Sequence, residues 1–207
     1  MFLVFDLETT GLPRMTQNRS FARPKWTKYY DTSRIVSISW THLDKNYKRM
    51  GTNYCLIKPD EFAIPEEATK IHGITNECAL QYGVPIKDMF QMLDHSATAS
   101  SHLVSHNIRF DKSILLSELY RYDQMELLEK ISKMSDYCTM MRGKKHLKVR
   151  KWPKLGELYQ SLFDKEMVGA HDAFYDTAHC TDCFIKLQDL ENQTLNHNLD
   201  TPLVIDM

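Results

Sequence analysis

The chain opens with the stretch "MFLVFDLETTGLP" (residues 1–13), in which an apolar run ends in two acidic residues, Asp6 and Glu8. Side chains two positions apart in a strand point to the same side of the sheet, so these carboxylates are expected to project together. Like charges held side by side repel each other and lose hydration, and a hard divalent cation would compensate them. The alternative is a frayed strand end in solvent, which matching acids elsewhere in the chain would argue against.

Length and composition set the limits of the interpretation. A chain of 207 residues, 43% of them hydrophobic, is long enough for one full core. The formal net charge of -1 gives no global indication of a nucleic-acid partner, so only local clusters of charge are informative. No stretch approaches the roughly 20 apolar residues of a membrane span, and the N-terminus lacks the features of a signal peptide. With five scattered cysteines, an odd number, we expect an intracellular, soluble protein without a membrane partner.

The order of the periodic segments predicts an α/β fold. Strand-like runs come first, and runs with helical period then alternate with shorter strands. Strands are expected at residues 2–7, 35–43, 53–58, 101–106 and 136–140, and helices at 64–73, 75–82, 85–95, 108–122, 155–163 and 172–190. This pattern predicts a mixed sheet covered by helices in a single domain, residues 1–190. Residues 191–207 are expected to form a tail that packs on the domain, docks on a partner or is disordered.

A third acid is found in "SHNIRFDKSILLSEL" (residues 105–119). Asn107 is placed to cap a helix there, and Asp111 precedes the apolar Ile114 and Leu115 by three and four positions. Asp111 therefore heads the stripe of the helix that faces the core, where an acid is unusual. The alternative is a favourable interaction of this carboxylate with the helix dipole.

A fourth acid is found in "GAHDAFYDTAHCTDCFIKL" (residues 169–187). The 3.6-residue period places Asp176 on the same face as Cys180 and Cys183, so Asp176 also points inward near the start of its helix. His171, five residues earlier, is expected on the preceding loop, where it can approach the same place. The two cysteines could indicate a zinc site, but His179 faces away from them, and packed free thiols are the preferred interpretation.

Four inward-facing carboxylates and a loop histidine meet the requirements of two-metal hydrolysis. Two divalent ions about 4 Å apart can stabilise the attacking and the leaving oxygen of a phosphodiester. Oxygen ligands suit Mg²⁺ or Mn²⁺ better than zinc. An ordinary histidine, with a pKa of about 6.5, can take the proton of an attacking water near neutral pH.

Three segments resemble the exonuclease motifs of the DEDDh 3′–5′ exonucleases. These are "FDLETTGLP" (residues 5–13), "HNIRFDKSIL" (residues 106–115) and "HDAFYD" (residues 171–176), and "IPEEATKIHGIT" (residues 64–75) is similar to the segment between the first two motifs. The family includes proofreading subunits of bacterial replicative polymerases, ribonuclease T and the TREX exonucleases. The H-x4-D spacing matches the histidine subtype, and the resemblance implies a ribonuclease H-like fold with a central five-stranded mixed sheet flanked by helices.

The resemblance also implies roles for individual residues. Two Mg²⁺ or Mn²⁺ ions would be held by Asp6, Glu8, Asp111 and Asp176, with Asp6 bridging them, and His171 would be the general base. The substrate would be approached by the backbone of Thr10 and Gly11, by Leu12 as a wedge, by the pocket residues His72 and Ile74, and by Asn107 and Phe110 near the second motif. For Leu12, Ile74 and Phe110, ordinary core packing is the alternative.

Two basic runs go beyond the motifs. Residues 13–34 form a stretch that is longer than the turn of many family members, with six basic residues interleaved with Trp26, Tyr29 and Tyr30. Residues 142–154 form a second basic run without an acid. A basic run is usually a solvated face, but such runs beside an acidic site, with stacking aromatics, favour contacts with the phosphates and bases of a single strand.

The sequence therefore predicts a metal-dependent 3′–5′ exonuclease that releases nucleoside 5′-monophosphates, with single-stranded DNA favoured and RNA possible as substrate. The alternative is a non-catalytic nucleic-acid-binding or scaffold protein that retains the fold. The presence of all four acids and of the histidine favours the enzyme. A proofreading role would require a separate polymerase as partner, because no polymerase domain is recognisable in this chain.

Overall fold

A computed structural model describes residues 1–199 of the chain, and for residues 194–199 it describes the helical backbone alone. Five strands form one sheet in the order β3-β2-β1-β4-β5, with β1 at its centre. β1 pairs antiparallel with β2 and parallel with β4, while β2 pairs antiparallel with β3 and β4 pairs parallel with β5. The strand bounds are β1 Phe2–Thr9, β2 Ile35–Leu43, β3 Arg49–Leu56, β4 His102–Ser105 and β5 Ser135–Cys138. The predicted five-stranded mixed sheet is confirmed.

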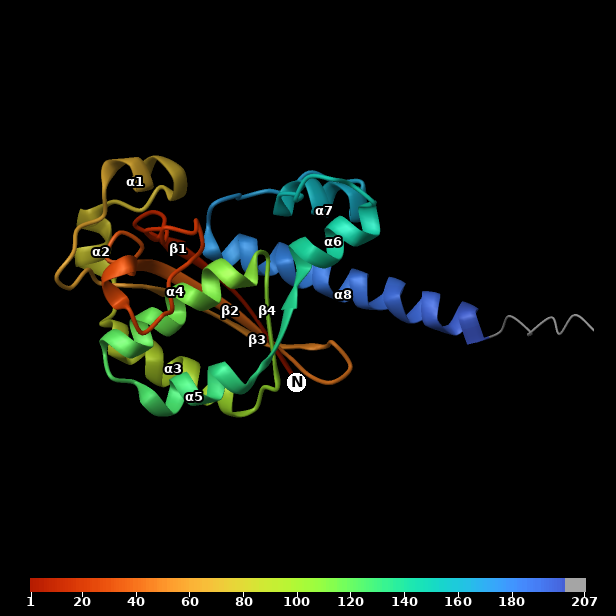
Figure 1. Cartoon of the computed structure of the whole chain (residues 1–207), viewed down its shortest axis with the longest axis horizontal. Helices are drawn as coiled ribbons and strands as arrows, with labels where there is room; N and C mark the ends of the chain where they lie inside the picture. Colours follow the sequence, from red (N-terminus) through yellow and green to blue (C-terminus); the bar gives the residue numbers. More distant parts are fainter. Residues whose placement is uncertain (200–207) are drawn as a thin grey trace, which may run out of the picture.

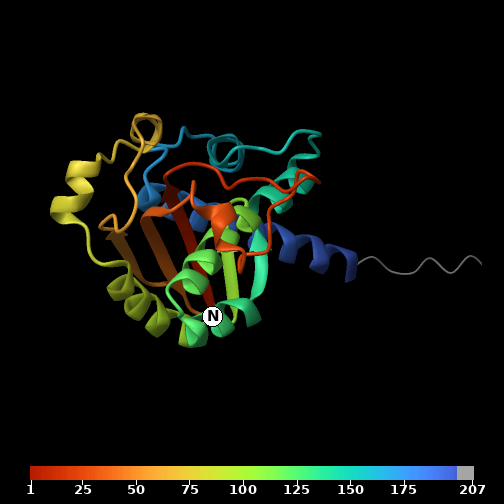
Figure 2. The ribbon, with the colours of Figure 1, turned by 60° about the vertical axis from the view of Figure 1, so that its left-hand side comes forward.

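Helices cover both faces of this sheet (Figures 1 and 2). One face carries α3 (Ile86–Thr98), α4 (Ile108–Arg121) and α5 (Met125–Lys133). The other face carries α8 (Ala173–Leu199), which contacts β1 to β4, and α6 (Thr139–Leu147) and α7 (Leu155–Phe163) pack against α8. The short helices α1 (Glu66–His72) and α2 (Asn76–Tyr82) lie in the connection between β3 and α3.

The alternation of side chains along β1 separates two cores. Leu3 and Phe5 pack into the cluster that includes residues of α3, α4 and α5, whereas Val4 packs into the cluster that includes Phe184 of α8. Because side chains alternate along a strand, Asp6 and Glu8 share the face of Val4. The two carboxylates therefore point to the side of the sheet on which α8 lies.

Two helices were not predicted from the sequence, and a third extends beyond its expected end. α5 is nine residues long, and α6 lies inside the second basic run, where Gly143 weakens the helical pattern. A Cβ atom at Gly143 would lie 2.7 Å from a methyl carbon of Leu158, so a close contact between α6 and α7 accounts for this glycine. α8 continues to Leu199 rather than ending near residue 190. The expected tail lies partly in this helix and, from residue 200 on, outside the described residues.

Asn107 is the residue before α4, as predicted, but its side chain does not cap the helix. That side chain makes no capping hydrogen bond, and the backbone of Asn107 is left-handed with φ of 73°. Its carbonyl oxygen accepts a hydrogen bond from the backbone N–H of Phe110 at 2.8 Å. Asparagine tolerates this conformation better than most residues, so Asn107 serves the sharp turn from β4 into α4.

Residues 13–34 form an ordered insertion that packs on α4. A bridge between Met15 and Phe21 and a short 3₁₀ helix, η1 (Thr27–Tyr30), organise its backbone. On α4, the guanidinium of Arg121 donates to the Thr27 carbonyl oxygen at 3.0 Å and to the Asp31 carboxylate at 2.7 Å. The insertion is thus attached to the helix that also carries Asp111.

Within residues 1–199, none of the helices combines the length and the apolar character that crossing a membrane requires.

Candidate active site

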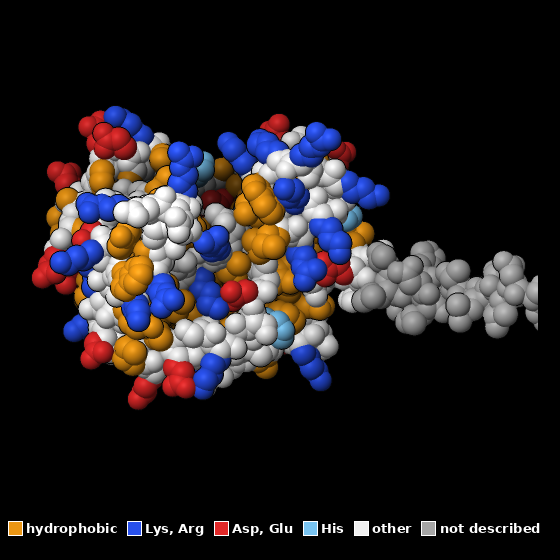
Figure 3. All heavy atoms as spheres, in the orientation of Figure 1, with side chains coloured by type: hydrophobic (Ala, Val, Ile, Leu, Met, Phe, Trp, Pro, Cys, Tyr) orange, Lys and Arg blue, Asp and Glu red, His pale blue; other side chains and the backbone are white. Residues whose placement is uncertain are grey.

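Four carboxylates converge from three elements. Asp6 and Glu8 come from the end of the central strand, Asp111 from the first turn of α4, and Asp176 from the first turn of α8. Their mutual repulsion is visible in Asp6, whose pKa is raised first by burial and then by Asp111, Asp176 and Glu8. Figure 3 shows acidic side chains at the bottom of a hollow that opens between α1 on one side and α6 and α7 on the other. Lys and Arg side chains lie around its rim in this view.

Burial makes the negative charge of these groups costly. Glu8 is 8% exposed and Asp111 is 4% exposed. Burial is the first cause that raises the pKa of Glu8 to about 8, that of Asp111 to about 7 and that of Asp176 to about 6. Neighbouring carboxylates raise each of these pKa values further. The cluster therefore has more negative charge than its surroundings compensate.

Hydrogen bonds satisfy only part of this cluster. The hydroxyl of Ser105 donates to Oδ2 of Asp111 at 2.6 Å, and the backbone N–H of His171 donates to Oδ2 of Asp176 at 3.1 Å. Oδ1 of Asp176 is buried and has no hydrogen-bond partner. A buried carboxylate oxygen without a partner is expensive, and a hard cation is the ligand that suits it.

His171 completes the cluster from the loop before α8. One ligand atom from each of Glu8, His171 and Asp176 lies within 4.8 Å of the others, which is close enough for a shared metal ion. His171 is exposed and has a left-handed backbone, with φ of 66°. The residues present thus fit a divalent cation, with oxygen donors and one imidazole.

His72, at the end of α1, lies beside this group. Its Nδ1 accepts a hydrogen bond from the backbone N–H of Ile74 at 3.1 Å, and its Nε2 is buried without a partner. The pKa of His72 is lowered, first by burial and then by the nearby His171. The structure therefore places His72 near His171 as a neutral imidazole at neutral pH.

The other residues predicted to contact substrate fall into two groups. Leu12 is 74% exposed, which excludes core packing for this side chain, and Gly11 beside it has φ of 150°. A Cβ atom at Gly11 would lie 3.0 Å from the Thr32 carbonyl oxygen, so the tight backbone there favours glycine. Thr10, in contrast, is buried, and its backbone N–H and its Oγ1 are both bonded to the backbone of Arg34.

Two further residues of that prediction pack against hydrophobic cores. Ile74 lies against the small cluster that includes Val36 and Ala79, and Phe110 lies against the large core beside α4. Each is half-buried, as is Asn107 at the turn into α4. Core packing, the alternative for Ile74 and Phe110, is thus present for both.

A family model described as RNase_T, exonuclease, matches residues 3–184. The chain belongs to this exonuclease family. The match confirms the resemblance that the three motifs carry. A comparison with curated protein sequences found no match.

Solved structures show the same fold as this chain. A zinc-bound complex of Escherichia coli exonuclease I with single-stranded DNA is 20% identical, with a TM-score of 0.71 over 95% of this chain and 42% of that chain. Exonuclease I of Methylocaldum szegediense gives 19% identity and a TM-score of 0.71, again with 95% and 42% covered. Exonuclease X in complex with 5′-overhanging duplex DNA gives 20% identity, a TM-score of 0.61 and 93% coverage of both chains. The chain spans less than half of the length of the exonuclease I chains.

The side chains of the two basic runs are partly paired within the chain. Arg34 is buried and donates to both carboxylate oxygens of Glu118, at 2.6 and 3.2 Å, so the expectation that it contacts phosphates is wrong. Arg142 lies 3.8 Å from Glu191 and over the ring of Tyr137, and Lys151 pairs with Glu157. Within the described residues, the insertion's cations without an ion pair are Arg14, Arg19, Arg23, Lys25 and Lys28.

Sequence reasoning missed two polar residues at the site of the exonuclease. Ser105 ends β4 and binds Asp111, a contact that depends on how β4 and α4 pack and leaves no mark in the sequence. Asp172 adds negative charge that raises the pKa values of Asp6, Glu8 and Asp176. Asp172 lies directly before a helix, a position at which an acidic residue often caps the first turn, and this position could have identified it from the sequence. In the structure its Oδ1 does accept a hydrogen bond from the backbone N–H of Phe174.

Cys180 and Cys183 of α8 are packed free thiols, as predicted. Cys180 and Cys183 are buried, and burial raises the pKa of Cys183 to about 12. Among the described residues, the group of side chains close enough to share a metal ion is Glu8, His171 and Asp176, and it contains neither cysteine. The interpretation as a zinc site is therefore not supported by their surroundings.

Proposed function

We propose that this exonuclease is metal-dependent, removes nucleotides from the 3′ end of single-stranded nucleic acid, with DNA favoured, and releases nucleoside 5′-monophosphates. The observation that carries the proposal is the uncompensated carboxylate cluster, in which one oxygen of Asp176 is buried without a partner. Such a cluster costs stability in the absence of a ligand, so its retention is explained by a function that needs cations.

The proposed cofactors are two Mg²⁺ or Mn²⁺ ions, held by Asp6, Glu8, Asp111 and Asp176. When bound, the ions would stabilise the charge that develops on the attacking and leaving oxygens of the phosphodiester. The side chain of Ser105 orients the Asp111 carboxylate, and the backbone N–H of His171 orients that of Asp176. This support holds both ligands in place before any cation arrives.

His171 is proposed to take the proton from the attacking water. Its imidazole is exposed on a loop and lies within 4.8 Å of ligand atoms of Glu8 and Asp176. The exposed side chain of Leu12 is proposed to contact the terminal base, and the tight backbone at Gly11 lets the strand approach closely. The neutral His72 beside His171 is proposed to line the pocket of the terminal nucleotide.

The unpaired cations of residues 13–34 and the cation Lys144 are proposed to bind phosphates. Lys144 lies over the ring of the exposed Trp152, with Nζ 3.9 Å from the ring centroid. Counterion release makes such binding weaken steeply as the salt concentration rises. Charge reversal at Arg23 and Lys25, or at Lys144 and Lys145, is expected to raise KM more than it lowers kcat.

A single assay tests the proposed function. A 5′-labelled single-stranded oligonucleotide is incubated with the protein and Mg²⁺ or Mn²⁺, with DNA and RNA versions in parallel and EDTA as control. The expected result is a metal-dependent ladder that shortens from the 3′ end, with mononucleotides as product. Binding of the oligonucleotide without cleavage under all metal conditions would contradict the proposal and support a non-catalytic protein.

A further inference from the structure

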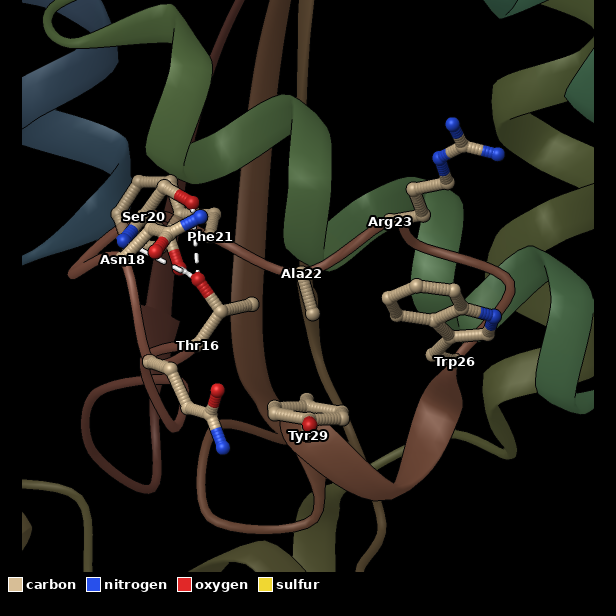
Figure 4. Close-up of a pocket in the computed structure, with 9 residues that line it drawn as sticks. Thr16, Asn18, Ser20, Phe21, Ala22, Arg23, Trp26 and Tyr29 are labelled. Atoms are coloured by element: carbon tan, nitrogen blue, oxygen red, sulfur yellow. Dashed lines mark hydrogen bonds between the residues drawn. The ribbon is translucent and has the colours of Figure 1, made fainter.

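The insertion of residues 13–34 contains a pocket of its own. The pocket has a volume of about 440 Å³ and is separate from the carboxylate cluster, none of whose residues line it. Figure 4 shows Thr16, Asn18 and Ser20 at one end, Trp26 and Arg23 at the other, and the ring of Tyr29 between them. Its lining residues are Thr16, Gln17, Asn18, Ser20, Phe21, Ala22, Arg23, Trp26 and Tyr29.

Local hydrogen bonds give this pocket a defined shape. The backbone N–H of Thr16 donates to the Ser20 carbonyl oxygen at 2.9 Å, and the two hydroxyls of these residues lie 2.9 Å apart (Figure 4). At the other side, the buried hydroxyl of Tyr30 donates to the Ala22 carbonyl oxygen at 2.6 Å. The pocket is therefore built by an ordered turn and a buried anchor.

The chemistry of the lining suits one nucleotide. Trp26 is 49% exposed and its ring lies 6.3 Å from that of Tyr29, so the pocket offers aromatic surface on which a base can stack. Within the described part of the chain, the side-chain amides of Gln17 and Asn18 have no hydrogen-bond partner, and Arg23 has no ion pair. Amides can bond to base edges, and the guanidinium of Arg23, which lies over the Trp26 ring at 6.0 Å from its centroid, can bond to a phosphate beside the stacked base.

The pocket is coupled in space to the carboxylate cluster through the start of α4. Phe21, which lines the pocket, has its ring 6.1 Å from that of Phe110, the residue directly before Asp111. The guanidinium of Arg109 lies over the same Phe21 ring at 5.5 Å. One helical turn therefore contacts both the pocket wall and the proposed metal site, so a single strand could occupy both.

We propose that this pocket binds an unpaired nucleotide of the substrate strand, upstream of the 3′-terminal nucleotide that is removed. The base stacks on Trp26 and Tyr29, its edge meets the amides of Gln17 and Asn18, and a flanking phosphate meets Arg23. This inference rests on the proposed function, because it assigns the bound nucleotide to the strand whose 3′ end lies at the carboxylate cluster. It predicts that long substrates gain affinity which very short ones do not.

The test compares two lengths of substrate. Fluorescence anisotropy measures binding of 5′-labelled dT3 and dT12 to the full chain in EDTA, where the proposed cleavage is absent. Trp26→Ala and Tyr29→Ala are each expected to weaken dT12 binding about tenfold, the equivalent of one lost stacking contact, and to leave dT3 binding unchanged. Tyr82→Ala, which removes a 68% exposed aromatic ring from α2, is the matched control and should affect neither substrate.

The outcomes separate the pocket from the proposed function. Unchanged dT12 affinity in both variants, or equal losses for dT3 and dT12, would overturn the assignment to an upstream nucleotide. The assignment would also be overturned if free dTMP quenched the fluorescence of Trp26 while the variants left the affinity for dT12 unchanged, because the pocket would then bind a free nucleotide and not the strand. Asn18→Ala, which removes an amide from an exposed turn, repeats the test without an aromatic change. Because the readout is binding, failure of the protein to cleave DNA would leave a length-specific loss of affinity intact.

Discussion

Two groups of buried charged side chains in this protein differ in whether the chain itself supplies the opposite charge. Arg34 and Glu118 form a bidentate ion pair with N–O distances of 2.6 and 3.2 Å, and Arg34 also donates to the hydroxyl of Tyr122 at 3.0 Å. The guanidinium further lies over the ring of Phe62, at 4.7 Å from its centroid. In the carboxylate cluster, in contrast, the negative charges repel one another, and this repulsion raises the pKa of Asp6. Within the described residues, no Lys or Arg side chain forms an ion pair with Asp6, Glu8, Asp111 or Asp176.

The difference shows what distinguishes a structural charge from a functional one. Burial raises the pKa of Glu118, and the hydrogen bonds and charge of Arg34 oppose that shift without cancelling it, so the buried carboxylate has its counter-charge within the chain. Burial also raises the pKa of Glu8, and there the neighbouring carboxylates add to the shift. The first group needs nothing from outside the chain, whereas the second is complete only with an external cation.

The largest expected effect is the loss of cleavage activity when the carboxylate cluster loses one of its members. Asp6→Asn is isosteric and removes one carboxylate, so kcat for a labelled oligonucleotide in Mg²⁺ should fall by at least about a thousandfold, the equivalent of several kcal/mol of lost metal-ion catalysis. Thermal unfolding in EDTA should show an unchanged or higher Tm, because a source of repulsion has been removed. Near-normal cleavage by the folded variant would contradict the assignment of Asp6 as a metal ligand.

The second-largest expected effect is the loss of activity when His171, the exposed histidine beside Glu8 and Asp176, is replaced. His171→Ala should lower kcat by about 10²–10⁴-fold, the range of general base catalysis, while metal-dependent stabilisation persists because all four carboxylates remain. Tyr175→Phe is the matched control, because this exposed residue lies beside Asp176 in sequence and the substitution keeps the ring that covers Gly169. A larger loss in Tyr175→Phe than in His171→Ala would overturn the assignment to the histidine subtype.

Substitutions in the Arg34–Glu118 ion pair should change the stability of the protein, because neither residue belongs to the carboxylate cluster. Arg34→Met leaves Glu118 buried with only the longer contact to Arg121, at 3.7 Å, and should lower the free energy of unfolding by about 3 kcal/mol. The double variant Arg34→Met with Glu118→Leu should recover much of that loss, since no lone buried charge is left. Urea unfolding measures both. A single variant as stable as the unsubstituted protein would mean that this pair is not compensated in the way its geometry indicates.

The smallest expected effect is a pH dependence of stability, to which the carboxylate cluster contributes. The pKa of Glu8 is raised from an ordinary value of 4.5 to about 8, so the folded state binds the proton more tightly than the unfolded state does. Its contribution to stability is fully present below about pH 4.5 and is lost as the pH rises through about 8. Asp111 and Asp176 shift in the same direction. Metal-free stability should therefore decline between about pH 5 and 8.

Two measurements sharpen this pH test. Glu8→Gln should flatten the decline of metal-free stability, and saturating Mg²⁺ should stabilise the unsubstituted protein most at the high end of the pH range, where the carboxylates are ionised. Urea unfolding at a series of pH values gives both slopes. A metal-free stability that rises across this range would show that the four carboxylates are not held together in the folded protein.

The sequence by itself determined the parts of the fold and site that depend on local periodicity. The alternation of β1 put Asp6 and Glu8 on one face, and the helical period turned Asp176 inward with Cys180, as the structure shows. These predictions succeed because strand and helix periods fix the direction of a side chain from its immediate neighbours.

Only the tertiary structure decided which polar residues meet across elements. Arg34 belongs to a basic run in the sequence, yet its partner Glu118 is 84 positions away and removes it from the surface. Ser105 reaches Asp111 across the turn at Asn107, and the hydroxyl of Tyr30 holds the carbonyl group of Ala22 at the wall of the insertion pocket. Such contacts depend on the packing of distant segments and on the cost of leaving a buried charge unpaired, and neither quantity can be read from local sequence.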